Sequence, residues 1–158
     1  MPRITPAAVD GNEYERVMGQ RLDIREQWFG LDAHMRFSGL LSPELKEEVR
    51  RSLAPGVGCV FCESLGAAKP EHGDRREALA VAYADLLRDP KQIDDATVEV
   101  LREEFSEAEI VELTCWALFM IAAQGFGAAM RIAPASEQDL ATYTEWRRDG
   151  EAAGAGAA

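Results

Sequence analysis

Two cysteines three residues apart, Cys59 and Cys62, are the residues of this chain best suited to chemistry. Pro55, Gly56 and Gly58 precede them, so we expect one helix to end there and a new helix to start at Cys59. Two cysteines at this spacing on a helical turn can close into a small disulfide ring. A thiol at a helix N-terminus also ionises more easily, because free N–H groups and the helix dipole favour the anion. The pair therefore meets the requirement for thiol redox chemistry, in which one thiolate attacks and its neighbour resolves.

The same pair has two other interpretations. Buried cysteines often behave as small hydrophobic residues without chemistry. Zinc needs about four ligands, and the pair supplies only two. The other soft candidates, His34, His72 and Cys115, form no second tight pair. We favour the redox interpretation, because a C-x-x-C pair in a chain without secretory features is more often catalytic or metal-binding than structural. We expect no metal and no cofactor.

The sequence around the pair resembles the alkylhydroperoxidase D and carboxymuconolactone decarboxylase superfamily. That superfamily has the pattern E-x(11)-C-x-x-C-x(3)-H, and here Glu47, Cys59 and Cys62 match its first three elements. Gly66 stands at the position of the last histidine. Phe61 stands where the peroxidase has a second histidine between its cysteines. The resemblance therefore includes the carboxylate and the cysteines and lacks both histidines.

A later stretch, F-S-E-A-E-I-V-E-L-T-C-W-A-L-F-M-I-A-A from Phe105, looks like the second conserved helix of that family. The similarity as a whole covers roughly residues 35–132. It implies an alkylhydroperoxidase D-like helical bundle. It also implies a homo-oligomer, a trimer or hexamer, with sites close to subunit contacts.

The resemblance implies roles for the cysteines: Cys62 would attack a hydroperoxide, and Cys59 would resolve the sulfenic acid into a disulfide. The helix argument alone favours Cys59 as the thiolate, because it lies nearer the helix start. Without the histidines, Glu47 is a poor base for a thiol unless its own pKa is raised. We expect such a rise, from burial, if Glu47 faces the cysteines. His34 is the best local candidate to replace the missing proton carrier, although a lone histidine there is more often packed than catalytic.

Helices are predicted throughout, since apolar residues recur at three- and four-residue steps and no segment alternates as a strand does. The predicted helices are 12–37, 42–53, a helix from Cys59, 75–88, 93–105, 106–132 with an interruption at 124–127, and 136–149. The fold class is therefore all-α, with one helical domain over residues 12–149. We expect residues 1–11 to form an extended arm and residues 150–158, which are low in complexity, to form a disordered tail.

Several expectations concern single positions within these helices. Glu47 and Glu48 cannot both face inward, and periodicity does not choose between them; the spacing to the cysteines selects Glu47. The run 115–123 is apolar nearly all round, which implies burial on every side, either in the core or at a subunit contact. Cys115 is then a buried bystander, whereas His72 lies in a polar loop and is expected to be exposed to solvent.

Composition excludes some classes of partner. The 158 residues include 28 acidic and 17 basic ones, a formal charge of −11, which argues against nucleic acid and anionic membrane surfaces. No signal peptide is evident, and the run 115–123 is too short to span a bilayer. We expect a cytoplasmic protein whose cysteines rest as a dithiol.

These observations predict a thiol-dependent antioxidant oxidoreductase, acting as a peroxidase or by dithiol–disulfide exchange. Its substrate would be a hydroperoxide or a disulfide, and its reductant a thiol that the sequence does not identify. The activity is expected to be weak, because the family histidines are absent. The alternative is a non-catalytic oligomeric scaffold, or a ligand-binding protein of the same fold.

Overall fold

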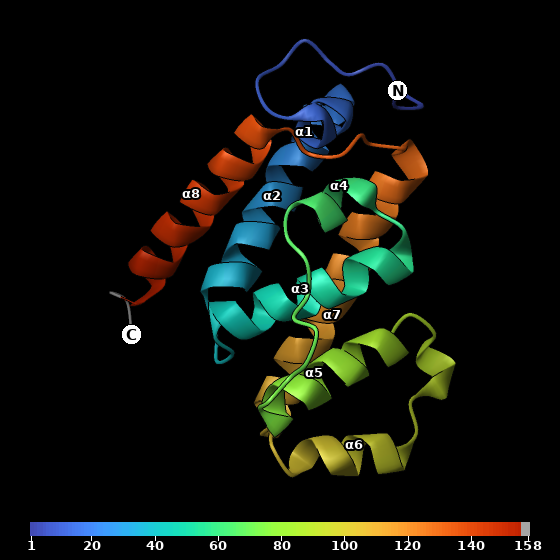
Figure 1. Cartoon of the computed structure of the whole chain (residues 1–158), viewed down its shortest axis with the longest axis vertical. Coiled ribbons are helices and arrows are strands. Elements are labelled where there is room, and N and C mark those ends of the chain that lie inside the picture. Colours follow the sequence, from blue (N-terminus) through green and yellow to red (C-terminus); the bar gives the residue numbers. More distant parts are fainter. Residues whose placement is uncertain (156–158) are drawn as a thin grey trace.

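The computed structural model describes residues 1–155, which form a bundle of α-helices (Figure 1). The helices are α1 (Glu13–Met18), α2 (Leu22–Phe37), α3 (Pro43–Val57), α4 (Val60–Ser64), α5 (Arg75–Leu86), α6 (Asp95–Arg102), α7 (Glu107–Met130) and α8 (Glu137–Ala155). Short 3₁₀ turns cover Gly19–Arg21 and Pro90–Gln92. Because residues 1–155 contain no strand, the predicted all-α class is confirmed.

The centre of the bundle is the crossing of α3 and α7. In Figure 1, α3 passes in front of α7, and α5 and α6 lie toward one end of the molecule. The other end holds α1, α4 and the N-terminal arm, while α8 lies alongside α2. Most of the large buried apolar side chains lie where α3, α5 and α7 meet, and a smaller apolar cluster at the α1 and α4 end contains both C-x-x-C cysteines.

Side-chain caps explain where the long helices start. Ser106 and Glu109 form the capping box that their spacing predicts: the Ser106 N–H donates to Glu109 Oε2 (2.8 Å), and Ser106 Oγ accepts from the Glu109 N–H (3.3 Å). At the start of α3, Ser42 Oγ accepts from the Leu45 N–H (3.2 Å), and Pro43 occupies the first turn. These caps satisfy backbone N–H groups that would otherwise have no partner.

The end of α3 differs from the prediction. The helix does not stop before Pro55 but continues through Pro55 and Gly56 to Val57. It ends at Gly58, which has a φ of 82°, a conformation that glycine adopts without strain. A proline costs a helix one N–H bond and a steric clash. Here Leu53 and Ala54, just before it, are fully packed in the core, which holds this last turn in place.

Two other boundaries also differ from expectation. The first long helix is divided at Gly19–Arg21, because a 3₁₀ turn separates α1 from α2 there; Gly30 lies within α2 without a break. The expected disordered tail begins inside α8, which extends to Ala155 because Gly150 packs directly on the Phe37 ring. A Cβ at position 150 would lie 2.4 Å from that ring. Residues 156–158 lie outside the described part of the chain.

Helix α7 is not buried on every side. Leu113 and Trp116 are fully buried, whereas Val111 and Leu118 are 62% and 42% exposed, and Cys115 is also exposed. Cys115 is therefore not the buried bystander that was predicted, because it lies on the outer face of α7. By length and composition alone, α7 would be able to cross a membrane. Its inner face instead packs on α3, α4 and α5 as the core helix of the bundle.

Candidate functional site

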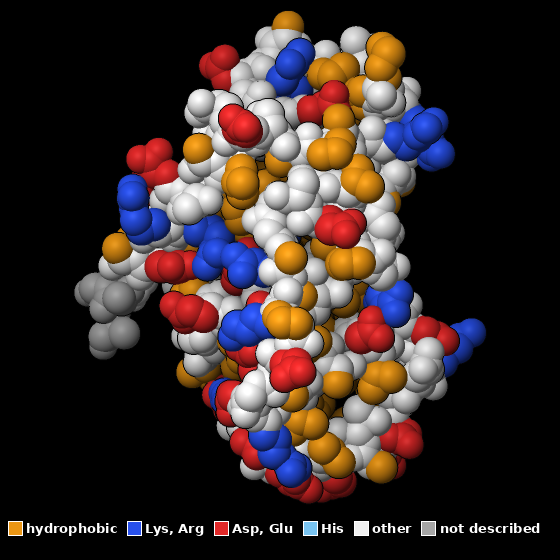
Figure 2. Space-filling view, viewed as in Figure 1, with side chains coloured by type: hydrophobic (Ala, Val, Ile, Leu, Met, Phe, Trp, Pro, Cys, Tyr) orange, Lys and Arg blue, Asp and Glu red, His pale blue; other side chains and the backbone are white. Residues whose placement is uncertain are grey.

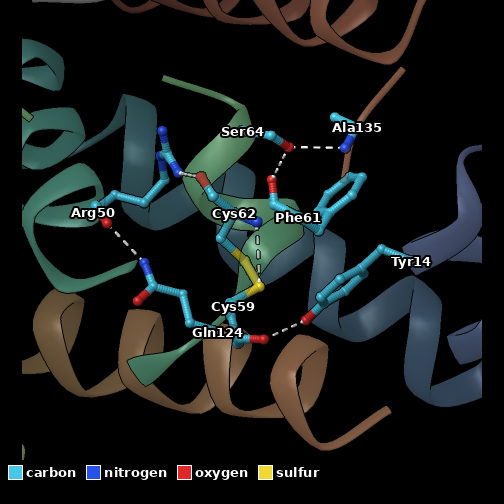
Figure 3. The surroundings of a disulfide bond; sticks show 9 residues. Tyr14, Arg50, Cys59, Phe61, Cys62, Ser64, Gln124 and Ala135 are labelled. Carbon is cyan, nitrogen blue, oxygen red and sulfur yellow. Dashed lines mark hydrogen bonds between the residues drawn. A yellow bond between two sulfur atoms is a disulfide. The ribbon is translucent and has the colours of Figure 1, made fainter. Parts of the chain in front are cut away.

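The C-x-x-C pair lies at the start of α4, as its spacing predicts. Cys59 is the N-cap residue, and its Sγ accepts a hydrogen bond from the Cys62 N–H (3.2 Å). The two cysteines form a disulfide, with their Cα atoms 5.2 Å apart (Figure 3). Cys59 is fully buried, and Cys62 is 8% exposed. The two sulfur atoms therefore differ in how easily another molecule can reach them.

Residues of α1 and α7 pack against the segment that carries the two cysteines. Gly127 leaves the space that Cys59 occupies, since a Cβ there would lie 2.5 Å from the Cys59 Sγ. Tyr14 donates its hydroxyl to the Ala123 carbonyl (2.9 Å), and its ring packs on Phe61 with 5.8 Å between ring centroids (Figure 3). Phe61, which stands where the peroxidase has a histidine, is therefore a packing residue here.

A cavity of about 680 Å³ opens in front of Cys62, between α1, α2, α4, α7 and α8. Cys62 lines this cavity and Cys59 does not. Aromatic side chains make up much of the wall: Trp28, Phe29, Phe61, Phe119, Tyr143 and Trp146. A molecule that enters the cavity therefore meets Cys62 and a largely apolar surface.

Glu47 lies on α3 behind the cavity wall and is 2% exposed. Its carboxylate is surrounded by cations. Four guanidinium groups lie within 4 Å of it, and a tyrosine hydroxyl donates to it. The partners are Arg36 (3.0 Å), Arg50 (2.8 Å), Arg51 (2.9 Å), Arg147 (3.4 Å) and Tyr143 (2.8 Å). The side chains come from α2, α3 and α8, so three helices meet at this one carboxylate.

These partners decide the protonation state of Glu47. Burial by itself raises the pKa of its carboxyl group, but hydrogen bonds from Arg50 and Tyr143 and the charges of Arg50 and Arg36 outweigh it. The resulting pKa is about 2. The expected rise in the Glu47 pKa is therefore wrong, because arginines surround the buried carboxylate and stabilise its charged form. A carboxylate with so low a pKa does not accept a proton from a thiol near neutral pH.

Arg50 connects Glu47 to the C-x-x-C pair. Its Nε and Nη2 bind the Glu47 carboxylate, and its Nη1 donates to the carbonyl oxygen of Cys62 (2.8 Å). Gln124 on α7 donates in turn to the Arg50 carbonyl (2.7 Å; Figure 3). No hydrogen bond joins Glu47 to either cysteine among the described residues, so Glu47 positions Arg50. The motif E-E-V-R-R at residues 47–51 could have predicted this contact, since residues three and four apart share a helix face.

Glu48 is also buried, which corrects the expectation that only one of the two neighbouring carboxylates faces inward. It is 2% exposed and accepts a hydrogen bond from the Lys69 N–H (2.7 Å). His72 lies nearby. It was predicted to be exposed to solvent, and this prediction is wrong, because its side chain is only 17% exposed. Its Nδ1 lies 2.8 Å from Glu77 Oε1.

The structure does not bring His34 to the cysteines. His34 is exposed on α2, does not line the cavity, and its ring makes no hydrogen bond to the described residues. Gly66 has a φ of 142°, a conformation that a histidine would adopt only under strain. The missing family histidine therefore cannot be restored at that position without a change in the backbone. Within residues 1–155, no group of histidine, cysteine, aspartate and glutamate side chains is arranged to hold a metal ion.

Comparison with known proteins yields no match to any family model, any curated protein or any solved structure. The function is therefore inferred from the geometry of the cysteines, the arginines and the cavity. The alkylhydroperoxidase D-like character of the bundle stays a prediction from the sequence pattern.

Proposed function

We propose that this protein is a thiol-dependent oxidoreductase of the alkylhydroperoxidase D-like kind. Its C-x-x-C pair would reduce a hydroperoxide, or exchange with a disulfide, inside the cavity. The observation that carries the proposal is that Cys62 lines the cavity while Cys59, within disulfide reach, is buried behind it. We further propose the homo-oligomeric assembly that the resemblance implies, which the exposed Val111 and Leu118 of α7 support.

The arginines supply positive charge near Cys62, which can favour its thiolate in place of the proton relay that the family histidines would provide. Around Glu47, four guanidinium groups face three carboxylates, those of Asp32, Glu47 and Glu151, which leaves one net positive charge in a protein of formal charge −11. Arg50 carries part of this charge directly to the backbone of Cys62. A nearby cation favours the thiolate over the thiol. Cys62 can therefore react as a thiolate without a dedicated base.

The reaction with a hydroperoxide follows from which sulfur is exposed. The Cys62 thiolate attacks the terminal oxygen, the O–O bond breaks, and the alcohol leaves after taking a proton from solvent. Cys62 is then a sulfenic acid. The Cys59 thiol attacks the Cys62 sulfur, the S–S bond forms, and the hydroxyl group leaves as water with the Cys59 proton. This sequence assigns attack to Cys62 and resolution to Cys59, as the resemblance implies.

The disulfide is reduced from the same side. An external thiolate attacks Cys62, the sulfur that lines the cavity, and Cys59 leaves as a thiolate. The Cys62 N–H that already donates to Cys59 Sγ stabilises that leaving group. A second external thiol then attacks the mixed disulfide, which releases Cys62 as a thiolate and an oxidised reductant. The reductant is consumed as two thiols for each turnover.

A thiol count tests the proposal. Cys115 is exposed, so the experiment uses a Cys115→Ser background. One equivalent of tert-butyl hydroperoxide should remove two thiols from the reduced protein and produce a Cys59–Cys62 disulfide by mass mapping. The Cys59→Ser variant should accumulate a sulfenic acid at Cys62 that dimedone traps. The Cys62→Ser variant should leave the hydroperoxide unconsumed.

Other outcomes discriminate between the candidate functions. Loss of thiols with glutathione disulfide but not with hydroperoxide would restrict the function to dithiol–disulfide exchange. If neither oxidant removes thiols, the redox proposal is overturned and the scaffold or ligand-binding alternative is favoured. The role of Arg50 has its own readout: Arg50→Met should slow iodoacetamide labelling of Cys62 by about 10-fold at neutral pH. Arg51→Met, which also removes a Glu47 partner but no contact to Cys62, is the matched control.

A further inference from the structure

Three residues that line the cavity each have one buried side-chain polar atom without a hydrogen-bond partner among residues 1–155. The atoms are Arg25 Nε and Arg36 Nε, which are donors, and Gln124 Oε1, an acceptor. Arg36 is 3% exposed and Gln124 is 1% exposed. Buried polar atoms in folded proteins nearly always have a partner, because an unpaired one loses its hydration without compensation. Three such atoms around one cavity therefore indicate that a bound molecule supplies partners.

The orientation of Gln124 is determined by its other contact. Its Nε2 donates to the Arg50 carbonyl, which leaves Oε1 as the free end of the amide (Figure 3). A ligand must therefore offer a hydrogen-bond donor to Gln124. Arg36 uses its Nη atoms on Glu47, Tyr143 and Asp32, so only its Nε–H is left to donate to a ligand acceptor.

The charges around the cavity disfavour a cationic ligand. The carboxylates of Asp32 and Glu47 already pair with the buried Arg36 and Arg50, so an ammonium group would find no free carboxylate at this depth. The aromatic wall matches an apolar ring system instead. A volume of about 680 Å³ lies in the range of small-molecule sites.

We infer that the cavity binds a largely apolar ring compound that carries a hydroxyl group. The hydroxyl donates to Gln124 Oε1, an oxygen of the ligand accepts from Arg36 Nε, and the rings lie against the aromatic wall. Such a molecule lies beside Cys62, and its role as the organic part of the substrate rests on the proposed function. Its binding depends only on the cavity.

A fluorescence titration with 2-naphthol tests the inference. The comparison compound is 2-methoxynaphthalene, which keeps the ring but has no donor. The wild-type protein should bind 2-naphthol about 10-fold more tightly than the methyl ether, because the ether leaves Gln124 Oε1 unpaired. Equal affinity for 2-naphthol and the ether, or no binding of either, would overturn the inference.

Substitution of Gln124 should remove the preference itself. In Gln124→Met the two affinities should become equal, whatever happens to their absolute values through the lost contact to Arg50. A purely structural role of Gln124 would leave the ratio unchanged and would count against the inference. Gln138→Met is the matched control, since Gln138 also lines the cavity but is exposed on α8. It should keep the full preference.

The same titration on a Cys59→Ser/Cys62→Ser variant separates this inference from the redox proposal. Binding with the hydroxyl preference should persist there, because neither sulfur contributes to it. If binding persists but the wild-type thiols do not react with oxidants, the redox proposal alone fails. If the thiols turn over with tert-butyl hydroperoxide but 2-naphthol does not bind, the ligand inference alone fails.

Discussion

Glu47 and Glu48 are neighbours on α3, and both carboxylates are buried, but the groups that surround them differ. Glu47 and Glu48 are each 2% exposed, yet four guanidinium groups surround Glu47, and Glu48 accepts a single backbone N–H from Lys69. The nearest cationic candidate to Glu48 is His72, whose Nδ1 is 3.9 Å away. Burial alone therefore does not identify a functional carboxylate; the groups that face it do.

The side of α3 with the arginines is also the side that reaches the cysteines. Arg50 extends from Glu47 to Cys62, and α8 closes the network by contributing Tyr143 and Arg147. Helix α8 follows the stretch 35–132 that resembles the known superfamily, so this chain builds the surroundings of Glu47 partly from a segment outside that resemblance. Figure 2 shows basic and acidic side chains interleaved between α8 and α3 on this face of the molecule.

The largest expected effect separates the two carboxylates directly. Glu47→Gln removes the negative charge from a buried cluster of arginines, so we expect it to lower the free energy of unfolding by about 3–5 kcal/mol. Glu48→Gln keeps an oxygen that can accept from Lys69, so its cost should be about 1 kcal/mol. Urea unfolding at pH 7 measures both. Similar losses in the two variants would mean that the arginines around Glu47 do not depend on its charge.

Acid unfolding sharpens the same comparison. The folded-state pKa of Glu47, about 2, is below the ordinary value of 4.5, so the stability it contributes is complete above pH 4.5 and is lost as the pH falls through 2. The full loss corresponds to roughly 3 kcal/mol. Urea unfolding between pH 5 and pH 2 should show this decline in the wild type and in Glu48→Gln. The decline in the free energy of unfolding should be smaller in Glu47→Gln. If that variant loses as much stability with falling pH as the wild type, other carboxylates cause the decline.

A smaller effect tests how tightly α7 packs on the cysteine side of the molecule. Gly127→Ala would place a Cβ 2.5 Å from the Cys59 Sγ, so we expect a loss of about 1–3 kcal/mol from overpacking. Gly125→Ala, two residues away, meets nothing within 4 Å and should stabilise the helix by up to about 1 kcal/mol. Thermal unfolding of the oxidised protein compares the two. Equal effects would show that Cys59 has more room than the structure gives it.

Some features could be predicted because they depend on residues close together in the chain. The capping box at Ser106, the Ser42 cap and the position of Cys59 at the start of α4 each involve neighbours three or four residues apart. Local hydrogen bonds and apolar periodicity were sufficient for these, and so for the all-α class. The extension of α3 through Pro55 was not predictable in this way, because it depends on core packing rather than on local preference.

The sequence by itself determined that helices would form and that two cysteines would lie within disulfide reach at the start of one of them. Only the tertiary structure decided the charge state of Glu47, since that depends on Arg36 from α2 and on Tyr143 and Arg147 from α8. It also decided that His34 lies outside the site and that Cys62, not Cys59, lines the cavity. The physical reason is that burial and charge are sums over neighbours in space. Tyr143, which hydrogen-bonds Glu47, is 96 residues away from it along the chain.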